Sequence, residues 1–322
     1  MKKTLLTICL VWMCFSLSAQ KIIDLSGKWS FSIDRQDNGE KEKWFSHTLN
    51  DFINLPGSMP EKLKGDEVTA KTQWTGSLYD SSYYYNPYME KYRKEGNIKF
   101  PFFLTPDKHY VGAAWYQKEV NIPADWKGER ILLFLERPHI ETTVWVNGQK
   151  TGIQNSLCVP HQYDITRYVR PGKCTITIRV DNRIKEINVG PDSHSITDQT
   201  QGNWNGIVGR ICLQTTPKTY FDDIQIYPEP EQKLARVKVV IKGTGTAKVK
   251  LSAESFNTDK KHIVPAIQQE IKLNKGVTET EMVLPMGNDM LLWDEFHPAL
   301  YKLKAEVTNG KKTEIKEIQF GM

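Results

Sequence analysis

The sequence predicts an all-β protein built from two successive sandwiches, the first jelly-roll-like and the second immunoglobulin-like. One observation is that short extended patterns recur along the chain, as in residues 113–120, 144–148 and 176–182, with tight-turn residues between them. A second is that few segments carry the spacing of a helix. The chain has 322 residues, of which 39% are hydrophobic and 11% aromatic, enough for about two soluble domains.

The first domain is predicted to span residues 20–219. Residues 25–33 alternate, which places Leu25, Trp29, Phe31 and Ile33 on one face. Residues 131–135 are continuously apolar, as expected for a strand covered on both faces. Residues 142–146 run into Asn147-Gly148, a strong hairpin signal because both residues tolerate positive φ.

A long segment from about residue 58 to residue 111 interrupts these strands. It holds Trp74 and a series of tyrosines between Tyr79 and Tyr92. A segment of this length in a compact domain is usually functional, partly structured or packed on a neighbour. The tyrosines could stack on sugar rings or pack against another domain or chain, and the sequence leaves both options open.

The second domain, residues 220–322, follows a proline-rich stretch between residues 216 and 230. Short alternating strands are predicted at 237–242, 247–253, 277–284 and 301–307. Their spacing over about 100 residues is typical of an immunoglobulin-like sandwich.

Residues 1–19 are expected to be a cleaved secretory signal. Lys2 and Lys3 precede an apolar run from 5 to 17, and Ser18-Ala19 supplies small residues for cleavage. A lipoprotein anchor at Cys14 is the less favoured alternative. We therefore expect an exported protein, periplasmic or extracellular, that does not reside in a membrane.

Charge and cysteine spacing argue against several other classes. A formal net charge of +5 is too small and too scattered to favour nucleic acid. Outside the signal only Cys158, Cys174 and Cys212 remain, without CxxC spacing, and we expect three buried free thiols. The histidines show no metal-ligand spacing, so neither a metal nor another cofactor is expected.

A series of short motifs carries a family resemblance. In chain order they are Leu25-Ser26-Gly27-Lys28-Trp29, Leu55-Pro56-Gly57-Ser58, Trp115-Tyr116, Ile122-Pro123-Ala124-Asp125-Trp126, Val144-Trp145-Val146-Asn147-Gly148, Val180-Asp181-Asn182, Asn205-Gly206-Ile207, Leu292-Trp293 and Pro298-Ala299-Leu300-Tyr301. Together they resemble glycoside hydrolase family 2, which includes β-galactosidases, β-glucuronidases and β-mannosidases. The resemblance covers nearly all of the chain after the signal.

The resemblance implies a catalytic partner for these two domains. In the family a TIM barrel follows them and carries two glutamates, one of which usually follows an asparagine. This chain has no Asn-Glu dipeptide and no second suitably spaced carboxylate. We therefore expect no catalytic residue and no glycosidase activity in this chain.

The best candidate substrate-binding residues are Asp198, Gln199, Asn203, Trp204 and Asn205. Carboxylate and amide groups suit the recognition of sugar hydroxyls, and an indole suits stacking on a sugar ring. In the family a loop at this position reaches toward the active site. The alternative is a polar turn with Trp204 as a packing anchor.

One local departure from the family follows this loop. The sequence Val208-Gly209-Arg210 replaces a bulky residue followed by arginine and an acid, which leaves the role of Arg210 open.

The sequence thus predicts the non-catalytic N-terminal portion of an exported family 2 enzyme, β-galactosidase-like. Its expected partners are carbohydrate and a catalytic barrel or an oligomer partner. The alternative is a stand-alone glycan-binding or scaffold protein.

Overall fold

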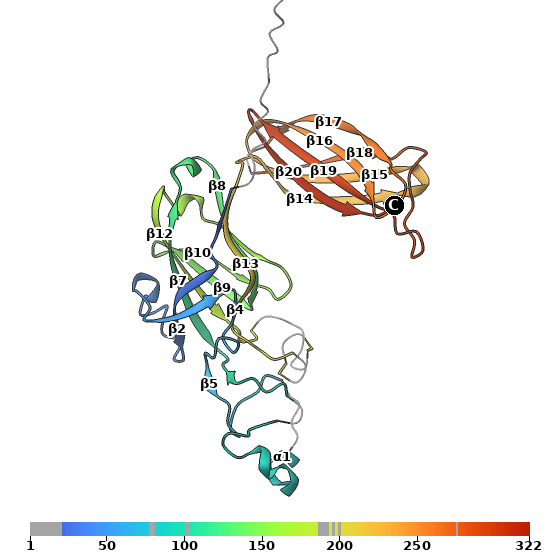
Figure 1. Cartoon of the computed structure of the whole chain (residues 1–322). Coiled ribbons are helices and arrows are strands. Elements are labelled where there is room, and N and C mark those ends of the chain that lie inside the picture. Colours follow the sequence, from blue (N-terminus) through green and yellow to red (C-terminus); the bar gives the residue numbers. More distant parts are fainter. Residues whose placement is uncertain are drawn as a thin grey trace, which may run out of the picture. The chain divides into compact units, whose positions relative to one another are not determined.

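The computed structural model describes residues 21–76, 81–100, 103–185, 193–194, 197–198, 201–274 and 276–322 (Figure 1). These residues are mostly strands, which confirms the predicted fold class. They divide into two compact units, residues 21–215 and residues 216–322. The expected signal, Tyr79 and Gln199 lie outside the described residues.

The first unit is a sandwich of two antiparallel sheets. One sheet has the order β10 (Gln149–Asn155), β9 (Glu141–Val146), β12 (Gly172–Asp181), β7 (Ala113–Ile122), β2 (Gly27–Asp34) and β3 (Asp51–Leu55). The other has the order β1 (Ile22–Asp24), β13 (Gly206–Thr216), β8 (Arg130–His139) and β11 (His161–Asp164), and β4 (Gly57–Ser58) also pairs with β13. Strands of these two sheets are connected by the short 3-10 turns η1 (Trp44–Ser46), η3 (Ala124–Trp126) and η4 (Thr166–Tyr168).

The core of this unit follows the predicted alternation. Leu25, Trp29 and Phe31 are buried in the main apolar cluster, and Ile33 packs against it while partly exposed. Asn147 and Gly148 have φ of 50° and 77°, as a type I′ turn requires, and they join β9 to β10. The hairpin prediction is therefore confirmed.

The other face of the six-stranded sheet is covered by the chain itself. Trp115 and Trp145 point there and form a second cluster with Leu49, Trp44 and Phe45 from the segment between β2 and β3. Phe45 stacks on Trp145 at 5.2 Å between ring centroids.

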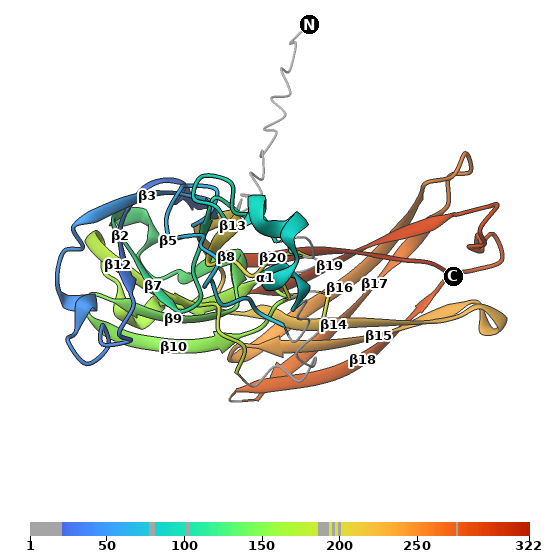
Figure 2. The ribbon, with the colours of Figure 1, turned by 90° about the horizontal axis from the view of Figure 1, so that it is seen from below.

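The second unit is also a two-sheet sandwich. One sheet has the order β14 (Tyr220–Glu229), β15 (Leu234–Lys242) and β18 (Val277–Pro285). The other has β17 (Ile263–Leu273), β16 (Gly245–Phe256), β19 (Leu300–Asn309) and β20 (Lys312–Phe320), and η5 (Pro230–Gln232) follows β14. Figure 2 shows the two sheets of this unit as separate layers.

All four predicted strands of the second unit are present, but β14, β17 and β20 were not predicted. β14 occupies much of the stretch in which proline had suggested a boundary. Pro228 fits there because β14 is at the edge of its sheet, where a missing amide donor costs no ladder bond.

Two further findings concern cysteines and membranes. Cys174 and Cys212 are buried as expected, whereas Cys158 is exposed, because it lies in the loop that follows β10. Among the described residues, the structure contains no helix with the length and apolar character needed to cross a bilayer.

Candidate functional site

The long segment between β4 and β7 has a core of its own. It contains β5 (Asp66–Glu67), α1 (Ser82–Tyr85), η2 (Pro87–Tyr92) and β6 (Lys108–His109). Trp74 stacks on Phe103 at 5.2 Å and contacts Phe100 and His109, while Tyr83 stacks on Phe100 at 4.6 Å. We call residues 59–112 the insertion, which Figure 1 draws around the labels β5 and α1. It is thus partly structured.

Asp198 joins the insertion to the loop before β13. Its carboxylate is 1% exposed and accepts hydrogen bonds from the backbone amides of Thr75 and Asn203, each at 2.6 Å. Its backbone exchanges further hydrogen bonds with the insertion, donating to the Thr75 carbonyl at 3.1 Å and accepting from the Leu104 amide at 3.0 Å. Asp198 therefore fixes the spacing between the two segments.

Asn203 and Asn205 bind the same loop to the sheet. The Asn203 amide exchanges hydrogen bonds with the side chain and backbone of Asn182, which directly follows β12. Asn205 Nδ2 donates to the carbonyls of Gly112 and Val180, both at 2.9 Å, and its Oδ1 accepts from the Tyr116 hydroxyl at 2.7 Å. Both side chains are buried, so their hydrogen-bonding capacity is largely used within the protein.

Trp204 is held between these two asparagines with its ring stacked on His139. The ring centroids are 4.5 Å apart at an interplanar angle of 22°, and His139 Nδ1 lies 2.8 Å from the Trp204 carbonyl oxygen. Burial lowers the pKa of His139 to about 4, so its imidazole is neutral at pH 7 and donates to that carbonyl through Nδ1. This contact fixes the orientation of a half-buried indole.

A pocket of about 1030 Å³ lies between the insertion and this loop. We call it the insertion pocket. Its lining combines apolar rings with polar side chains that can recognise hydroxyls. The rings belong to Tyr92, Phe100, Phe103 and Trp204, and the polar side chains include Asn97, Lys99, Asp107 and Gln201.

The predicted site residues are distributed unequally around this pocket. Asp198, Asn203 and Trp204 line it, whereas Asn205 is not in its lining and lies beneath the loop against Tyr116. Their assignment to substrate binding stays a prediction. Sequence reasoning missed the opposite wall, which described residues of 89–100 and 103–107 form, although the length and aromatic content of the insertion were a signal for it.

The tyrosines of the insertion occupy three different environments. Tyr83 is buried in the aromatic cluster, and its hydroxyl donates to the Tyr92 carbonyl at 2.8 Å. Tyr92 lines the pocket, while Tyr84, Tyr85 and Tyr88 are exposed.

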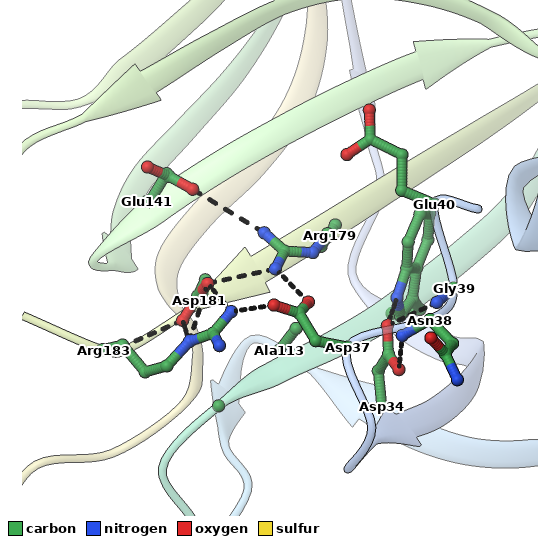
Figure 3. A network of polar contacts seen from close by, with 12 residues as sticks. Asp34, Asp37, Asn38, Gly39, Glu40, Ala113, Glu141, Arg179, Asp181 and Arg183 are labelled. Atoms are coloured by element: carbon green, nitrogen blue, oxygen red, sulfur yellow. Dashed lines mark hydrogen bonds and ion pairs between the residues drawn. The ribbon is translucent and has the colours of Figure 1, made fainter. Parts of the chain in front are cut away.

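A second polar cluster lies at the end of β12 (Figure 3). Arg179 is close to three carboxylates, with distances of 2.6 Å to Asp37, 3.1 Å to Asp181 and 3.6 Å to Glu141. Burial raises the pKa of the Asp181 carboxyl, but hydrogen bonds from Arg183 and Lys185 outweigh it and hold that pKa far below its ordinary value. The cluster is therefore an ionised structural network.

Figure 3 also shows how Asp34 orders the segment that follows β2. Its carboxylate accepts from the backbone amides of Asn38 and Gly39, each at 2.8 Å, and from Trp115 Nε1 at 2.9 Å. The two polar clusters thus support irregular backbone at the same end of β2, β7 and β12.

The described carboxyl groups with a displaced pKa are all stabilised in the ionised form. Retaining glycosidases require one carboxyl with a raised pKa beside one that is ionised. Each described carboxyl whose pKa departs from its ordinary value has that pKa lowered.

The departure at Gly209 and Arg210 has a local explanation. Gly209 has φ of 76°, and a Cβ at that position would lie 2.8 Å from the carboxyl carbon of Glu136. Arg210 then pairs with Glu136 at 3.0 Å. In this chain the arginine therefore joins β13 to β8.

The described residues contain no group of three or more histidine, cysteine or acidic side chains arranged to hold a metal ion.

Comparison with known proteins places the chain in a family. Residues 22–217 match the family model "Glycosyl hydrolases family 2, sugar binding domain", and residues 219–322 match "Glycosyl hydrolases family 2". The chain belongs to glycosyl hydrolase family 2, as the motifs predicted, and corresponds to the N-terminal domains of its members.

Similar curated proteins are much longer than this chain. A human β-glucuronidase is 24% identical over 88% of this chain and 41% of its own length. A β-glucuronidase of Paenibacillus borealis is 24% identical over 94% of this chain and 45% of its own length. A β-galactosidase of Clostridium acetobutylicum is 24% identical over 87% of this chain and 28% of its own length. The chain thus spans less than half the length of each of these relatives.

Solved structures share the fold. The crystal structure of a Ruminococcus gnavus β-glucuronidase superimposes with a TM-score of 0.60 at 17% identity, covering 94% of this chain and 45% of that one. A β-glucuronidase of an uncultured Clostridium species superimposes with a TM-score of 0.60 at 20% identity, covering 95% of this chain and 45% of that one.

Proposed function

We propose that this chain is the non-catalytic N-terminal portion of an exported family 2 β-glycosidase, acting in carbohydrate degradation. The observation that carries the proposal is that residues 22–217 and 219–322 match two family 2 domains while the chain spans only 41% of the human β-glucuronidase to which it is similar. In the complete enzyme a barrel would supply the acid and the nucleophile, and this chain would hold part of the glycan.

For the sugar, we retain the β-galactosidase-like substrate indicated by the motifs. A β-glucuronide is the second candidate, favoured by the names of the relatives above. A stand-alone glycan-binding protein is the other class, and the location of the whole pocket within residues 21–215 favours it.

An assay of the purified chain tests the absence of catalysis. We expect no turnover of nitrophenyl β-galactoside, β-glucuronide or β-mannoside above a buffer control. Turnover that stays with the chain through successive columns would overturn the proposal.

Export is tested separately. The full-length chain expressed in a Gram-negative host should appear in the periplasmic fraction with the mass of residues 20–322. Cytoplasmic protein that retains residues 1–19 would contradict export.

A further inference from the structure

We propose that the insertion pocket is a complete subsite for a neutral oligosaccharide and binds it without any catalytic domain. The inference rests on the proposed function for the ligand class, carbohydrate. It adds the location of the site, the charge of the sugar and independence from a barrel.

The pocket's size favours several sugar rings over one. Its volume of about 1030 Å³ is at the upper end of the range for small-molecule sites, roughly 300–1,000 Å³. Its two walls come from described residues of the stretches 89–100 and 103–107 on one side and from residues 198 and 201–204 on the other, about 100 positions away in the chain, with Ser58 and Pro60 completing the described lining. An extended ligand could therefore contact both walls at once.

The rings that line the pocket are ordered before any ligand arrives. Phe103 stacks on Trp74 at an interplanar angle of 11°, and Trp204 stacks on His139. The Tyr92 backbone is held by hydrogen bonds from the Tyr83 hydroxyl and the Lys99 amide. Rings already in place lose little conformational entropy when they stack on the apolar face of a sugar.

Polar side chains remain available beside these rings. Gln201 and Asp107 line the pocket, and neither side chain makes a hydrogen bond within the described part of the protein. Asn97 uses Nδ2 to donate to the Lys91 carbonyl at 2.8 Å. An amide and a carboxylate in this state suit adjacent sugar hydroxyls, which both donate and accept.

The charges of the lining favour a neutral sugar over an acidic one. Carboxylate recognition typically uses the two-pronged guanidinium of arginine, and no arginine lines the pocket among the described residues. Lys99 is its one described cation, and Asp107 and Asp198 line it too. A uronate would therefore meet more negative than positive charge.

Isothermal calorimetry on the purified chain tests this inference. The probes are neutral galactotetraose, cellotetraose and mannotetraose, with tetragalacturonate as the acidic comparison. We expect at least one neutral tetrasaccharide to bind with a Kd in the micromolar to millimolar range, and at least 10-fold more tightly than tetragalacturonate. No binding by any neutral probe, or tighter binding of the acidic one, would overturn the inference.

Variants locate the site. Trp204→Ala should weaken binding at least 10-fold, and Gln201→Ala, at an exposed position, should weaken it several-fold without affecting folding. Tyr88→Ala is the matched control, because Tyr88 is an aromatic residue of the insertion that is 85% exposed and outside the lining. Equal affinity in Gln201→Ala and the wild type would refute the location even if Trp204→Ala failed to fold.

The binding experiments and the turnover assay test the pocket and the proposed function separately. Glycosidase turnover by the chain would refute the non-catalytic proposal and leave the pocket result standing. Absence of both binding and turnover would refute only the independent subsite.

Discussion

The two sandwiches share an antiparallel architecture but differ in what they bury. In residues 216–322, Thr219 and Thr278 are the only buried polar side chains among the described residues. In residues 21–215 the buried set includes Arg179, Asp181, Asn182, Asp198, Asn203 and Asn205. The second unit is an almost purely apolar core, whereas the first also contains a buried polar framework.

The difference shows what the first sandwich has to support. Its polar framework lies where β12 ends and β7 begins, next to the insertion and the loop before β13. Irregular backbone cannot satisfy its own amides and carbonyls as a sheet does, so buried side chains have to do so. The polar framework is therefore the physical basis of the pocket.

Among substitutions that test this difference between the two units, Asp181→Asn should have the largest effect on the free energy of unfolding. It removes a fully buried charge from the Arg179 network and should lower the free energy of unfolding by about 3 kcal/mol, as measured in urea. The matched control is Glu279→Gln, which removes an exposed ion pair with Lys238 in the second unit. It should leave the free energy of unfolding nearly unchanged, because water screens this pair. Equal losses of stability in Asp181→Asn and Glu279→Gln would contradict the proposed difference between the two units.

Between pH 7 and pH 5 the largest pH dependence of stability should come from the first unit, because its buried His139 titrates in that range. His139 has an ordinary pKa of 6.5 when unfolded and about 4 when folded, so the unfolded chain binds more protons between these values. Stability should be fully present above pH 6.5 and fall as the pH is lowered toward 4, by about 2 kcal/mol at pH 5. Burial also lowers the pKa of His161, which acts in the same direction.

Urea midpoints at pH 7 and pH 5 measure this dependence. His139→Gln should reduce the difference between the two midpoints. A difference that the substitution leaves unchanged would show that His139 is not its source.

Asp198→Asn should act locally. The carboxylate accepts two short backbone hydrogen bonds, and a neutral amide in its place would weaken both. We expect amide hydrogen exchange at Thr75 and Asn203 to accelerate by about tenfold, equivalent to about 1.4 kcal/mol. Exchange in β16 and β19 serves as the internal reference, and acceleration there as well would indicate global destabilisation instead.

The smallest perturbation is thiol labelling of the native chain. Cys158 is exposed and should react with a maleimide within minutes at pH 7. Burial raises the pKa of the Cys174 thiol to about 11, so Cys174 should react only after unfolding. Mass spectrometry of the labelled peptides distinguishes the sites, and labelling of native Cys174 would contradict the packing of the first core.

Local signals predicted the regular parts of the fold. The alternation around Trp29 and the Asn147-Gly148 turn depend on neighbouring residues alone, and both were found as predicted. β14 was not predicted because a proline such as Pro228 argues locally against a strand. The proline is tolerated only because β14 lies at the edge of its sheet, which the sequence alone does not reveal.

The candidate site was predictable only in part. The composition of their loop singled out Asp198 and Trp204 as candidates, but the pocket that they line depends on a contact between Asp198 and Thr75, 123 positions apart. Asn205 shows that residue type alone does not distinguish a ligand-binding side chain from a structural one. An amide suited to a sugar hydroxyl is equally suited to the protein's own carbonyls, and here it binds those of Gly112 and Val180.

A crystal structure of the chain soaked with the tightest-binding neutral tetrasaccharide would test the central claim most directly. We predict sugar density between Trp204 and Phe103, with hydroxyls within hydrogen-bonding distance of Gln201 or Asp107. Sugar bound elsewhere on the first sandwich, with the pocket between the two walls left empty, would contradict the account.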